Sequence, residues 1–455
     1  MEKLFKLKEH GTNVKTEIIA GITTFLAMVY ILAVNPSILS ASGMDAAAVF
    51  TATAVSAAFG CAFMAFFANY PIALASGMGL NAYFAFTVCG ELAAQGVNDP
   101  WKVALTAILV EGIIFIILSL FKFRETLVHK VPANLKYGIS AGIGLFIVIV
   151  ALKGAGIVVA SESTLVDLGS VGSAQFALAF IGFIIIAALR HFKVPGDILI
   201  GILATWVLGM GAQAIGWYQV DPAAGAYSLF PSFSGASFIP AAPNLFQFSF
   251  GFIAEHAVQF ASIVFAFLFV DLFDTVGTVI GVADKANLLD KEGNLPRVGA
   301  TLMADAVGTV AGACLGTSTV TSYVESSAGV AAGGKTGLTA LTTGVLFILA
   351  LVLSPIFLAI PSFATTPALM FVGLLMMSSV KKMTFEGDIA DVVAGFVAII
   401  MMPFTYSIAN GIMFGILSWV VLKLITGKVK DIHPVMWVSS ALFVLRILTL
   451  VMGWQ

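Results

Sequence analysis

Long apolar segments separated by short polar ones follow each other through the whole chain. Each segment has about 20 residues, the length of a helix that crosses a bilayer. The pattern therefore predicts an all-α polytopic membrane protein with about fourteen transmembrane helices. The first set is expected at 16–34, 46–68, 72–90, 101–120, 137–160, 173–190 and 196–215. The second set, after a long loop, is expected at 259–283, 298–315, 320–334, 336–354, 364–380, 389–406 and 408–426.

The composition supports a membrane protein and excludes an ordinary soluble one. Hydrophobic residues make up 60% of the chain and charged residues 10%, with a mean hydropathy of +1.04, whereas soluble domains carry about 25% charged residues. The net charge of −2 and the lack of a basic cluster predict no nucleic-acid partner. The three cysteines have no CxxC spacing and the five histidines no HExxH pairing, so we expect no metal and no cofactor. With no evident nucleophile–base pair either, the chain is predicted not to be an enzyme.

Lysine and arginine concentrate in alternate loops, and this predicts the orientation. Four lysines precede the first helix, so the positive-inside rule places the N-terminus in the cytoplasm. The further cations expected inside are Lys122, Arg124, Lys130, Lys136, Arg190, Lys193, Lys285, Lys291, Arg297, Lys335, Lys381, Lys382, Lys423, Lys428 and Lys430. The acids expected outside are Asp45, Glu91, Asp99, Glu162, Asp167 and Asp221. The loop at about 216–250 has no lysine or arginine and is also expected outside.

The apolar stretch at 433–453, interrupted by Arg446, is compatible with a further span or with a helix at the membrane interface. We favour the interface, because a further span would place the C-terminus outside. The sequence thus predicts a multi-pass protein of the cytoplasmic membrane, with both termini in the cytoplasm.

A weak internal repeat relates the two sets of helices. Pro132-Ala133 is followed by Gly138 in the fifth segment, and Pro367-Ala368 is followed by Gly373 at the same spacing in the twelfth. Pairing the fifth segment with the twelfth is what a seven-plus-seven duplication predicts. An odd number of helices in each unit gives the two units opposite orientations, the inverted repeat of many secondary transporters.

The third and tenth segments are short and interrupted by glycine, and acids lie in the eighth and tenth segments. Asp271 and Asp274 sit inside the apolar run 267–282, and Glu325 follows the hydroxyl-rich run 317–323. Broken segments at matching positions are the best sequence indication of a transporter's binding site. A carboxylate at membrane depth costs roughly 2.5–3.5 kcal/mol on insertion scales, so it generally faces a cavity or another protein group.

Four motifs, from the first, third, eighth and tenth segments, resemble the nucleobase–ascorbate transporter superfamily (nucleobase–cation symporters). They are Gly21-ITTFLAMVYILAVNP, Ala75-SGMGLNAYFAF, Asp271-LFDTVGT and Thr321-SYVESSAG. The resemblance covers nearly the whole chain and is strongest to the AzgA-like branch of adenine, guanine and hypoxanthine permeases. It implies proton-coupled, elevator-like uptake of a purine base by a homodimeric protein in the lipid bilayer.

The resemblance also implies two domains, each made from two parts of the chain. The core domain would comprise 1–121 and 245–355, with helices 1–4 and 8–11. The gate domain would comprise 122–244 and 356–455, with helices 5–7 and 12–14 and the C-terminal interfacial helix.

Site residues follow from matching the family motifs. The resemblance assigns binding carboxylates to Asp274 and Glu325 and a binding amide to Asn81, and it gives the site Ser322 and Tyr323 from the tenth segment. Carboxylates accept purine N–H groups in charge-assisted bonds, and an amide both donates and accepts. An aromatic residue, Phe84 or its neighbour Phe86, would stack on the base.

Structural alternatives stay open for several of these residues. Asn81 could brace the helix break, Asp271 could line the cavity or brace the core, and the phenylalanines could simply pack. Asp305 and Glu111 are expected to brace the core.

Proton coupling is assigned to Asp274, with Asp271 and Glu325 as the other candidates. Burial and a neighbouring acid both favour the protonated form of a carboxyl group, so such a pair can take up a proton near neutral pH. Two alternative functions share this fold: transport of another nucleobase (xanthine, urate or uracil) and anion exchange. Thr278, at a position often charged or imidazole in the uracil and xanthine branches, argues against the former. The paired acids, without a predicted intramembrane cation, argue against the latter.

Overall fold

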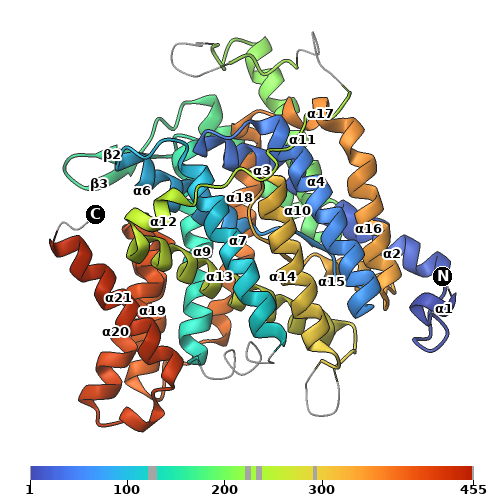
Figure 1. Cartoon of the computed structure of the whole chain (residues 1–455). Helices are drawn as coiled ribbons and strands as arrows, with labels where there is room; N and C mark the ends of the chain where they lie inside the picture. Colours follow the sequence, from blue (N-terminus) through green and yellow to red (C-terminus); the bar gives the residue numbers. More distant parts are fainter. Residues whose placement is uncertain (1, 121–130, 221–226, 232–237, 290–294, 453–455) are drawn as a thin grey trace.

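The computed structural model describes residues 2–120, 131–220, 227–231, 238–289 and 295–452. Five charged positions used above to predict the orientation lie outside these ranges: Lys122, Arg124, Lys130, Asp221 and Lys291. Within the described ranges the chain is mostly helical, with two small two-stranded sheets (Figure 1).

Helices of the first half begin where side chains cap them. Asn13 accepts from Thr16 N at 3.0 Å and Asp45 from Ala48 N at 2.7 Å, which satisfies backbone donors at the helix starts. The helices are α1 (Glu2–Phe5), α2 (Val14–Met28), α3 (Ile31–Leu39), α4 (Ala46–Phe63), α5 (Met78–Ala82), α6 (Cys89–Ala94), α7 (Pro100–Leu120), α9 (Ala133–Gly154), α10 (Ala174–His191) and α11 (Asp197–Ala214). The shorter elements are η1 (Ser40–Ser42), η2 (Met64–Ala68), β1 (Leu74–Ser76), η3 (Tyr83–Val88), β2 (Val158–Ser161) and β3 (Leu165–Leu168).

The second half contains one long helix and a second broken segment. Its helices are α12 (Gly251–Glu255), α13 (Ala257–Lys285), α14 (Val298–Leu315), α15 (Ser326–Ala331), α16 (Gly337–Leu349), α17 (Ser354–Leu358), α18 (Ser362–Met377), α19 (Ile389–Phe404), α20 (Ile408–Ile425) and α21 (Pro434–Met452). The shorter elements are β4 (Val320–Ser322), η5 (Ala350–Leu353), η6 (Ser378–Lys382) and η7 (Val429–Asp431).

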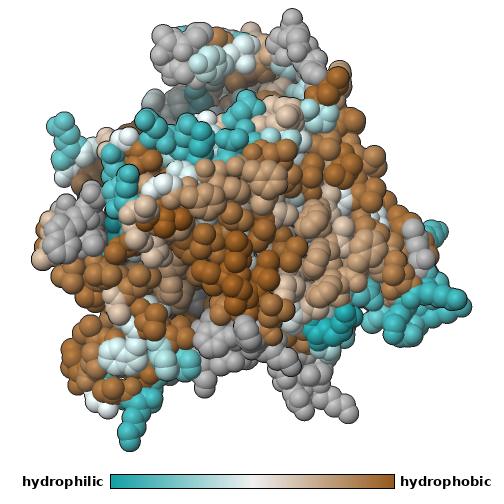
Figure 2. Space-filling view, viewed as in Figure 1, coloured by the Kyte–Doolittle hydropathy of each residue, from teal (hydrophilic) through white to brown (hydrophobic). Residues whose placement is uncertain are grey.

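Every predicted segment has a counterpart among these elements. Ten helices of the described residues are long and apolar enough to cross a membrane, and three shorter apolar helices lie at 257–272, 389–404 and 434–448. The space-filling view shows a broad apolar zone across the molecule, with more hydrophilic residues towards its top and its lower edges (Figure 2). These features confirm the helical membrane architecture.

Three local features differ from the sequence expectation. The fifth segment, expected over 137–160, is helical over 133–154, and the chain then forms the antiparallel hairpin β2–β3. The first segment is interrupted at Val29–Tyr30, between α2 and α3. Pro132 precedes α9, whereas Pro367 lies inside α18, so the two proline motifs occupy different helix positions.

The long helices pack as two groups. One group contains α2, α4, α7, α14, α15 and α16, and the other contains α9, α10, α11, α18, α19 and α20. Glycine allows close approach within the second group, because a Cβ on Gly144 would lie 2.7 Å from the Gly373 carbonyl oxygen. The helix α13 contacts α7 and α15 of the first group and α9 and α20 of the second, and the strands β1 and β4 of the broken segments pack against α4 and α14.

Candidate functional site

The two broken segments are joined by their backbones. Strands β1 and β4 pair antiparallel, with Ala75 opposite Thr321. Each segment is extended through a stretch of small or hydroxyl side chains and then turns into a short helix, β1 into α5 and β4 into α15. Backbone bonds at both ends, from Gly77 N to Thr319 O at 2.9 Å and from Tyr323 N to Ala73 O at 3.0 Å, extend the pairing. The backbone polar groups freed by the breaks are therefore satisfied by each other, as membrane depth requires.

A cavity of about 1120 Å³ lies beside this strand pair. Asp274 on α13 and Glu325, the residue before α15, both line it, although they are far apart in sequence. Its other walls come from both helix groups: α2 and α15 on one side, and α9, α18 and the α10–α11 turn on the other. The structure thus brings together the two acids that the motifs assigned to binding.

Glu325 is held by a tyrosine from the interruption between α2 and α3. The Tyr30 hydroxyl donates to Glu325 Oε1 at 2.7 Å, and the Tyr30 side chain is buried. A hydrogen bond to an ionised group contributes about 1.5–3 kcal/mol. Tyr30 therefore fixes the orientation of one carboxylate oxygen and leaves Oε2 for other partners.

Asp271 and Asp305 belong to a buried polar cluster. Thr275 lies 2.9 Å from Asp271 Oδ1 and 3.0 Å from Asp305 Oδ1, and it also lies 2.8 Å from the Thr321 hydroxyl. Ser322 N donates to Asp305 Oδ1 at 3.1 Å, so this cluster attaches β4 to α13 and α14. Neither acid lines the cavity, and both occupy bracing positions.

Glu111 braces the same region from α7. It accepts a hydrogen bond from the Thr319 hydroxyl at 3.0 Å, just before β4, and both residues are buried. Acids from three helices, α7, α13 and α14, therefore surround the extended part of the tenth segment.

Ser322 and Tyr323 lie in the strand and the turn that follows it. The Tyr323 hydroxyl donates to the Ser76 carbonyl oxygen at 2.5 Å, so this side chain connects the two broken segments. Both residues are buried, and neither is among the residues that line the cavity.

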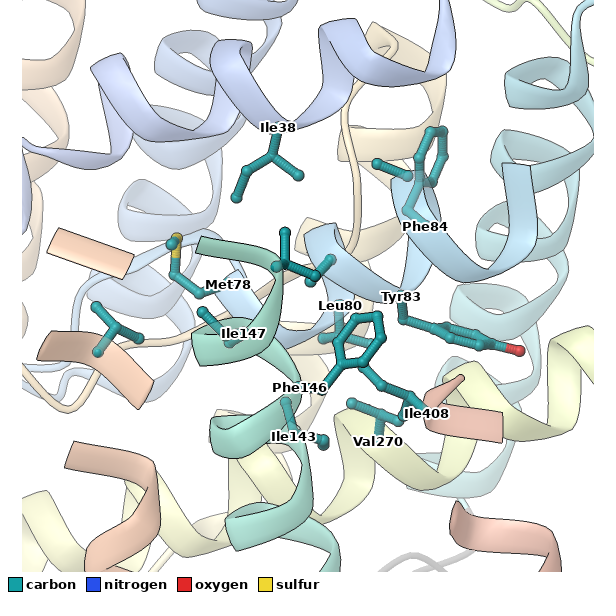
Figure 3. Packing of buried hydrophobic residues seen from close by; sticks show 14 of the residues in the cluster. Ile38, Met78, Leu80, Tyr83, Phe84, Ile143, Phe146, Ile147, Val270 and Ile408 are labelled. Carbon is teal, nitrogen blue, oxygen red and sulfur yellow. The ribbon is translucent and has the colours of Figure 1, made fainter. Parts of the chain in front are cut away.

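Asn81 and Phe84 are not among the residues that line the cavity. The Asn81 Oδ1 accepts from Ser76 Oγ at 2.8 Å, and the whole residue is buried. Phe84 packs in the apolar core with Tyr83, Leu80 and Phe146 nearby in the close view (Figure 3). The Asn81 Nδ2 has no hydrogen-bond partner among the described residues, so binding and bracing both stay open for Asn81, whereas Phe84 packs in the core.

The cavity also contains residues that the sequence did not indicate as site residues. Thr23, Thr278 and Ser327 supply hydroxyl groups, and Arg190 forms an ion pair with Asp197 across the α10–α11 turn, Nε to Oδ2 at 3.2 Å. The cavity therefore does contain a cation, which the sequence argument against anions did not foresee. Two sequence features could have indicated these groups: Tyr30 inside an apolar run, and Arg190 and Asp197 on either side of the Pro195-Gly196 turn. Among the described residues no group of three or more His, Cys, Asp and Glu is placed to hold a metal ion.

Solved structures of membrane transporters share this architecture. The transmembrane domain of the cyanobacterial bicarbonate transporter BicA superposes with a TM-score of 0.66 at 17% identity, covering 88% of this chain and 97% of that one. SLC26A9 superposes with a TM-score of 0.63 at 14% identity, covering 91% of this chain and 66% of that one. At this level of identity the likeness concerns the fold alone.

Sequence comparison gives the family. The Permease family model (Xan_ur_permease) matches residues 15–414. Adenine permease AdeP of Escherichia coli is 41% identical over 98% of this chain and 96% of its own length. Guanine/hypoxanthine permease PbuO of Bacillus subtilis is 43% identical over 98% of this chain and 100% of its own length. The chain therefore belongs to the nucleobase–ascorbate transporter family of membrane permeases, and it is a transporter rather than an enzyme.

Proposed function

We propose that the protein transports purine nucleobases, adenine or guanine and hypoxanthine, across the cytoplasmic membrane. The observation that carries this proposal is the meeting of Asp274 and Glu325 in one cavity. Relatives at 41–43% identity over nearly the full chain are named adenine and guanine/hypoxanthine permeases, which supports the same substrate class here.

The cavity chemistry suits a flat base with alternating N–H donors and ring-nitrogen acceptors. Glu325 Oε2 accepts an N–H group, while Tyr30 holds the other oxygen. The hydroxyls of Thr278 and Ser327 both donate and accept, so they match ring nitrogens or exocyclic groups of the purine. An analogue without the N–H would leave the acceptor unpaired and would bind less well.

Asp274 is our proposed proton carrier. It lines the cavity together with Glu325, and unlike Glu325 it lies on the long helix α13, beside the buried cluster of Asp271, Thr275 and Asp305. When protonated, Asp274 would no longer repel the charge of Glu325, while the cavity residue Asp197 is already paired with Arg190. Release of the proton on the cytoplasmic side would restore repulsion between the two acids and favour return of the empty carrier.

Movement of one helix group against the other would carry the site across the membrane. The group with α2, α4, α7, α14, α15 and α16 corresponds to the expected core, and the group with α9–α11 and α18–α20 to the expected gate. The cavity between them is lined at its edge by Lys136, Lys193, Lys285 and Lys382, cations expected in the cytoplasm. We therefore propose that the structure is the inward-open state of an elevator-like cycle. The homodimer implied by the family is a further proposal, which light scattering of the detergent-solubilised protein would test.

The packing of α21 favours a different orientation of the C-terminus from the one expected from the sequence. Asp431 lies 3.7 Å from Lys423 at the end of α20, whereas Arg446 lines a small cavity with Ala409 at the start of α20. The helix therefore runs antiparallel along α20, and its 19 residues extend about 28 Å, close to the bilayer thickness. We propose that α21 crosses the membrane and ends outside, while the N-terminus is cytoplasmic. A cysteine replacing Val451 should then react with an impermeant thiol reagent in intact spheroplasts, and reaction only after lysis would contradict this.

Anion exchange is the second candidate, supported by the fold of BicA and SLC26A9 and by Arg190 in the cavity. Arg190 is paired with Asp197, and the two acids would repel an anion, so the residues favour the base.

The deciding experiment is uptake of radiolabelled adenine, guanine and hypoxanthine in cells that lack purine transport. Uptake should be competed by purine bases, should not be competed by xanthine, uracil or bicarbonate, and should rise when the external pH is lowered. Uptake of an anion without uptake of any base would refute the proposal.

A further inference from the structure

A second cavity lies at the opposite end of α13 from Asp274. It has a volume of about 400 Å³ and is lined by residues of η3, α6, α13, α20 and α21. Gln259 lines it, and Gln259 and Asp274 are fifteen residues apart on one helix, or about 22 Å along the axis. Glu91, on the side of the acids expected outside, is also part of the lining, so this cavity faces the outer side of the membrane.

A cluster of four buried apolar residues, here called the plug, includes a residue of α13 between Gln259 and Asp274. Leu80 and Val270 come from the third segment and α13, and Phe146 and Ile408 come from α9 and α20; all four are almost fully buried (Figure 3). Val270 is one helical turn from Asp274, and Ile408 is next to Ala409, which lines the small cavity. The plug is thus formed by residues from elements on both sides of the interface that must slide in an elevator-like cycle.

The small cavity contains a buried acceptor without a donor. The Gln259 side chain is 5% exposed, and its Nε2 donates to Gln95 Oε1 at 3.0 Å. Its Oε1 accepts no hydrogen bond from any described residue. Leaving a buried acceptor unpaired costs about 1–3 kcal/mol, so this group is arranged for a donor that comes from outside the protein.

The other lining residues offer groups that complement a purine. Asn410 and Arg446 supply N–H donors, and Glu91 supplies an acceptor that also takes the Ser407 hydroxyl at 3.3 Å. Tyr83 and Phe443 supply aromatic side chains. The volume falls within the roughly 300–1,000 Å³ range of pockets that hold small molecules.

We propose that this cavity is a second, outer binding site for the same purine base. It would hold the base on the outer side while the inner cavity is open to the cytoplasm. An N–H edge of the base would pair with Gln259 Oε1, and its ring nitrogens or carbonyl would accept from Asn410 and Arg446. This inference rests on purine transport as the proposed function, but it adds a site that includes none of the residues assigned to the inner one.

Binding stoichiometry tests the outer site. Calorimetry with adenine and with hypoxanthine on the purified full-length protein should give two sites for the wild type. Gln259→Leu, which keeps the side-chain size and removes the acceptor, should remove one site or weaken it by ~10-fold or more. Gln259→Glu keeps an acceptor oxygen and should retain both sites, which distinguishes a lost contact from a misfolded protein. Gln247→Leu, at an exposed loop position, is the matched control and should behave as wild type.

Uptake kinetics separate this inference from the function on which it depends. In cells, Gln259→Leu should raise the KM for uptake by ~10-fold at low external base, with a maximal rate within about twofold of wild type. A single site in the wild type, or a Gln259→Leu protein with two sites and an unchanged KM, would overturn the outer site while leaving purine transport intact. A wild type that binds and transports no purine would instead overturn the proposed function.

Discussion

In the tenth segment the residue before the short helix is Glu325, which lines the inner cavity; in the third segment the residue in that position is Gly77. A Cβ on Gly77 would lie 2.6 Å from the Thr321 methyl group, so there is no room for a side chain at position 77, where β4 packs against the third segment. The two segments thus have related backbones and different tasks. In our proposal the tenth presents the charge to the substrate, and the third supplies a close-fitting support through Ser76 and Asn81.

The first test asks whether proton coupling resides outside both segments, on α13. Asp274→Asn should mimic the protonated acid, so binding of the base persists but accumulation against a gradient is lost completely. Calorimetry and pH-driven uptake in proteoliposomes measure the two properties. If the variant still concentrates the base under an imposed pH gradient, the proton site is Glu325 or Asp271.

The second test concerns the charge of the tenth segment. Glu325→Gln should weaken base binding by about 1.5–3 kcal/mol, or roughly 10- to 150-fold, because a hydrogen bond to a charged acceptor becomes one to a neutral amide. Calorimetry on the purified protein measures this loss. An affinity within twofold of wild type would show that the carboxylate does not contact the base.

The third test concerns the support role of the third segment. Asn81→Ala removes the acceptor of the Ser76 hydroxyl and should destabilise the protein by about 1–3 kcal/mol, with the KM for uptake unchanged. Thermal unfolding in detergent and uptake kinetics measure the two effects, with Asn98→Ala at an exposed position as control. A raised KM with normal stability would assign Asn81 to substrate contact, as the family motif implies.

A smaller effect is expected at the tyrosine that holds Glu325. Tyr30→Phe removes only the hydroxyl and should weaken binding by about 1 kcal/mol, or roughly fivefold, because the carboxylate keeps its charge and loses its fixed orientation. Tyr227→Phe, at an exposed tyrosine, provides the control. Loss of binding as large as that of Glu325→Gln would mean that Tyr30 contacts the base itself.

The smallest effect on transport is expected at an acid far from both segments. Hydrogen bonds from Lys423 and Lys428 hold the pKa of Asp388 well below its usual value. Its contribution to stability is therefore present above the ordinary carboxyl pKa and is lost as the pH falls towards the lowered value. Asp388→Asn should lower the unfolding temperature at pH 7, leave base affinity unchanged, and reduce the difference in stability between pH 7 and pH 3. A change in affinity would show that neutralising any acid perturbs the site.

The helices could be predicted well because each one that crosses the bilayer needs about 20 apolar residues, and such segments are visible in the hydropathy of the chain. The sequence also located the breaks, because Gly77, Gly79 and the hydroxyl run at 317–323 interrupt the apolar segments. The pairing of β1 with β4 was not predicted, because strands of three residues leave no trace in a pattern of 20-residue segments. The contact of Tyr30 with Glu325 joins residues 295 positions apart, and only the tertiary structure brings them together.

The direction of the side chains in the third segment could not be predicted from the sequence, and the reason is local. Tyr83–Val88 form a π-helical stretch directly after α5, so the side chains there do not follow α-helical spacing. Phe84 consequently packs in the core. Motif matching identified the segment correctly, but it could not give the rotation of each residue about the helix axis.

Because β1 and β4 are joined through their backbones, the fold of the site and its substrate selectivity can evolve separately. The hydrogen bonds of this bridge join main-chain atoms, so the bridge depends on an extended backbone and on side chains that fit these buried positions, and not on one particular residue type. Side chains at and beyond the strand ends can then diversify while the bridge persists. The superposition on BicA at 17% identity shows that the overall fold persists through wide sequence change.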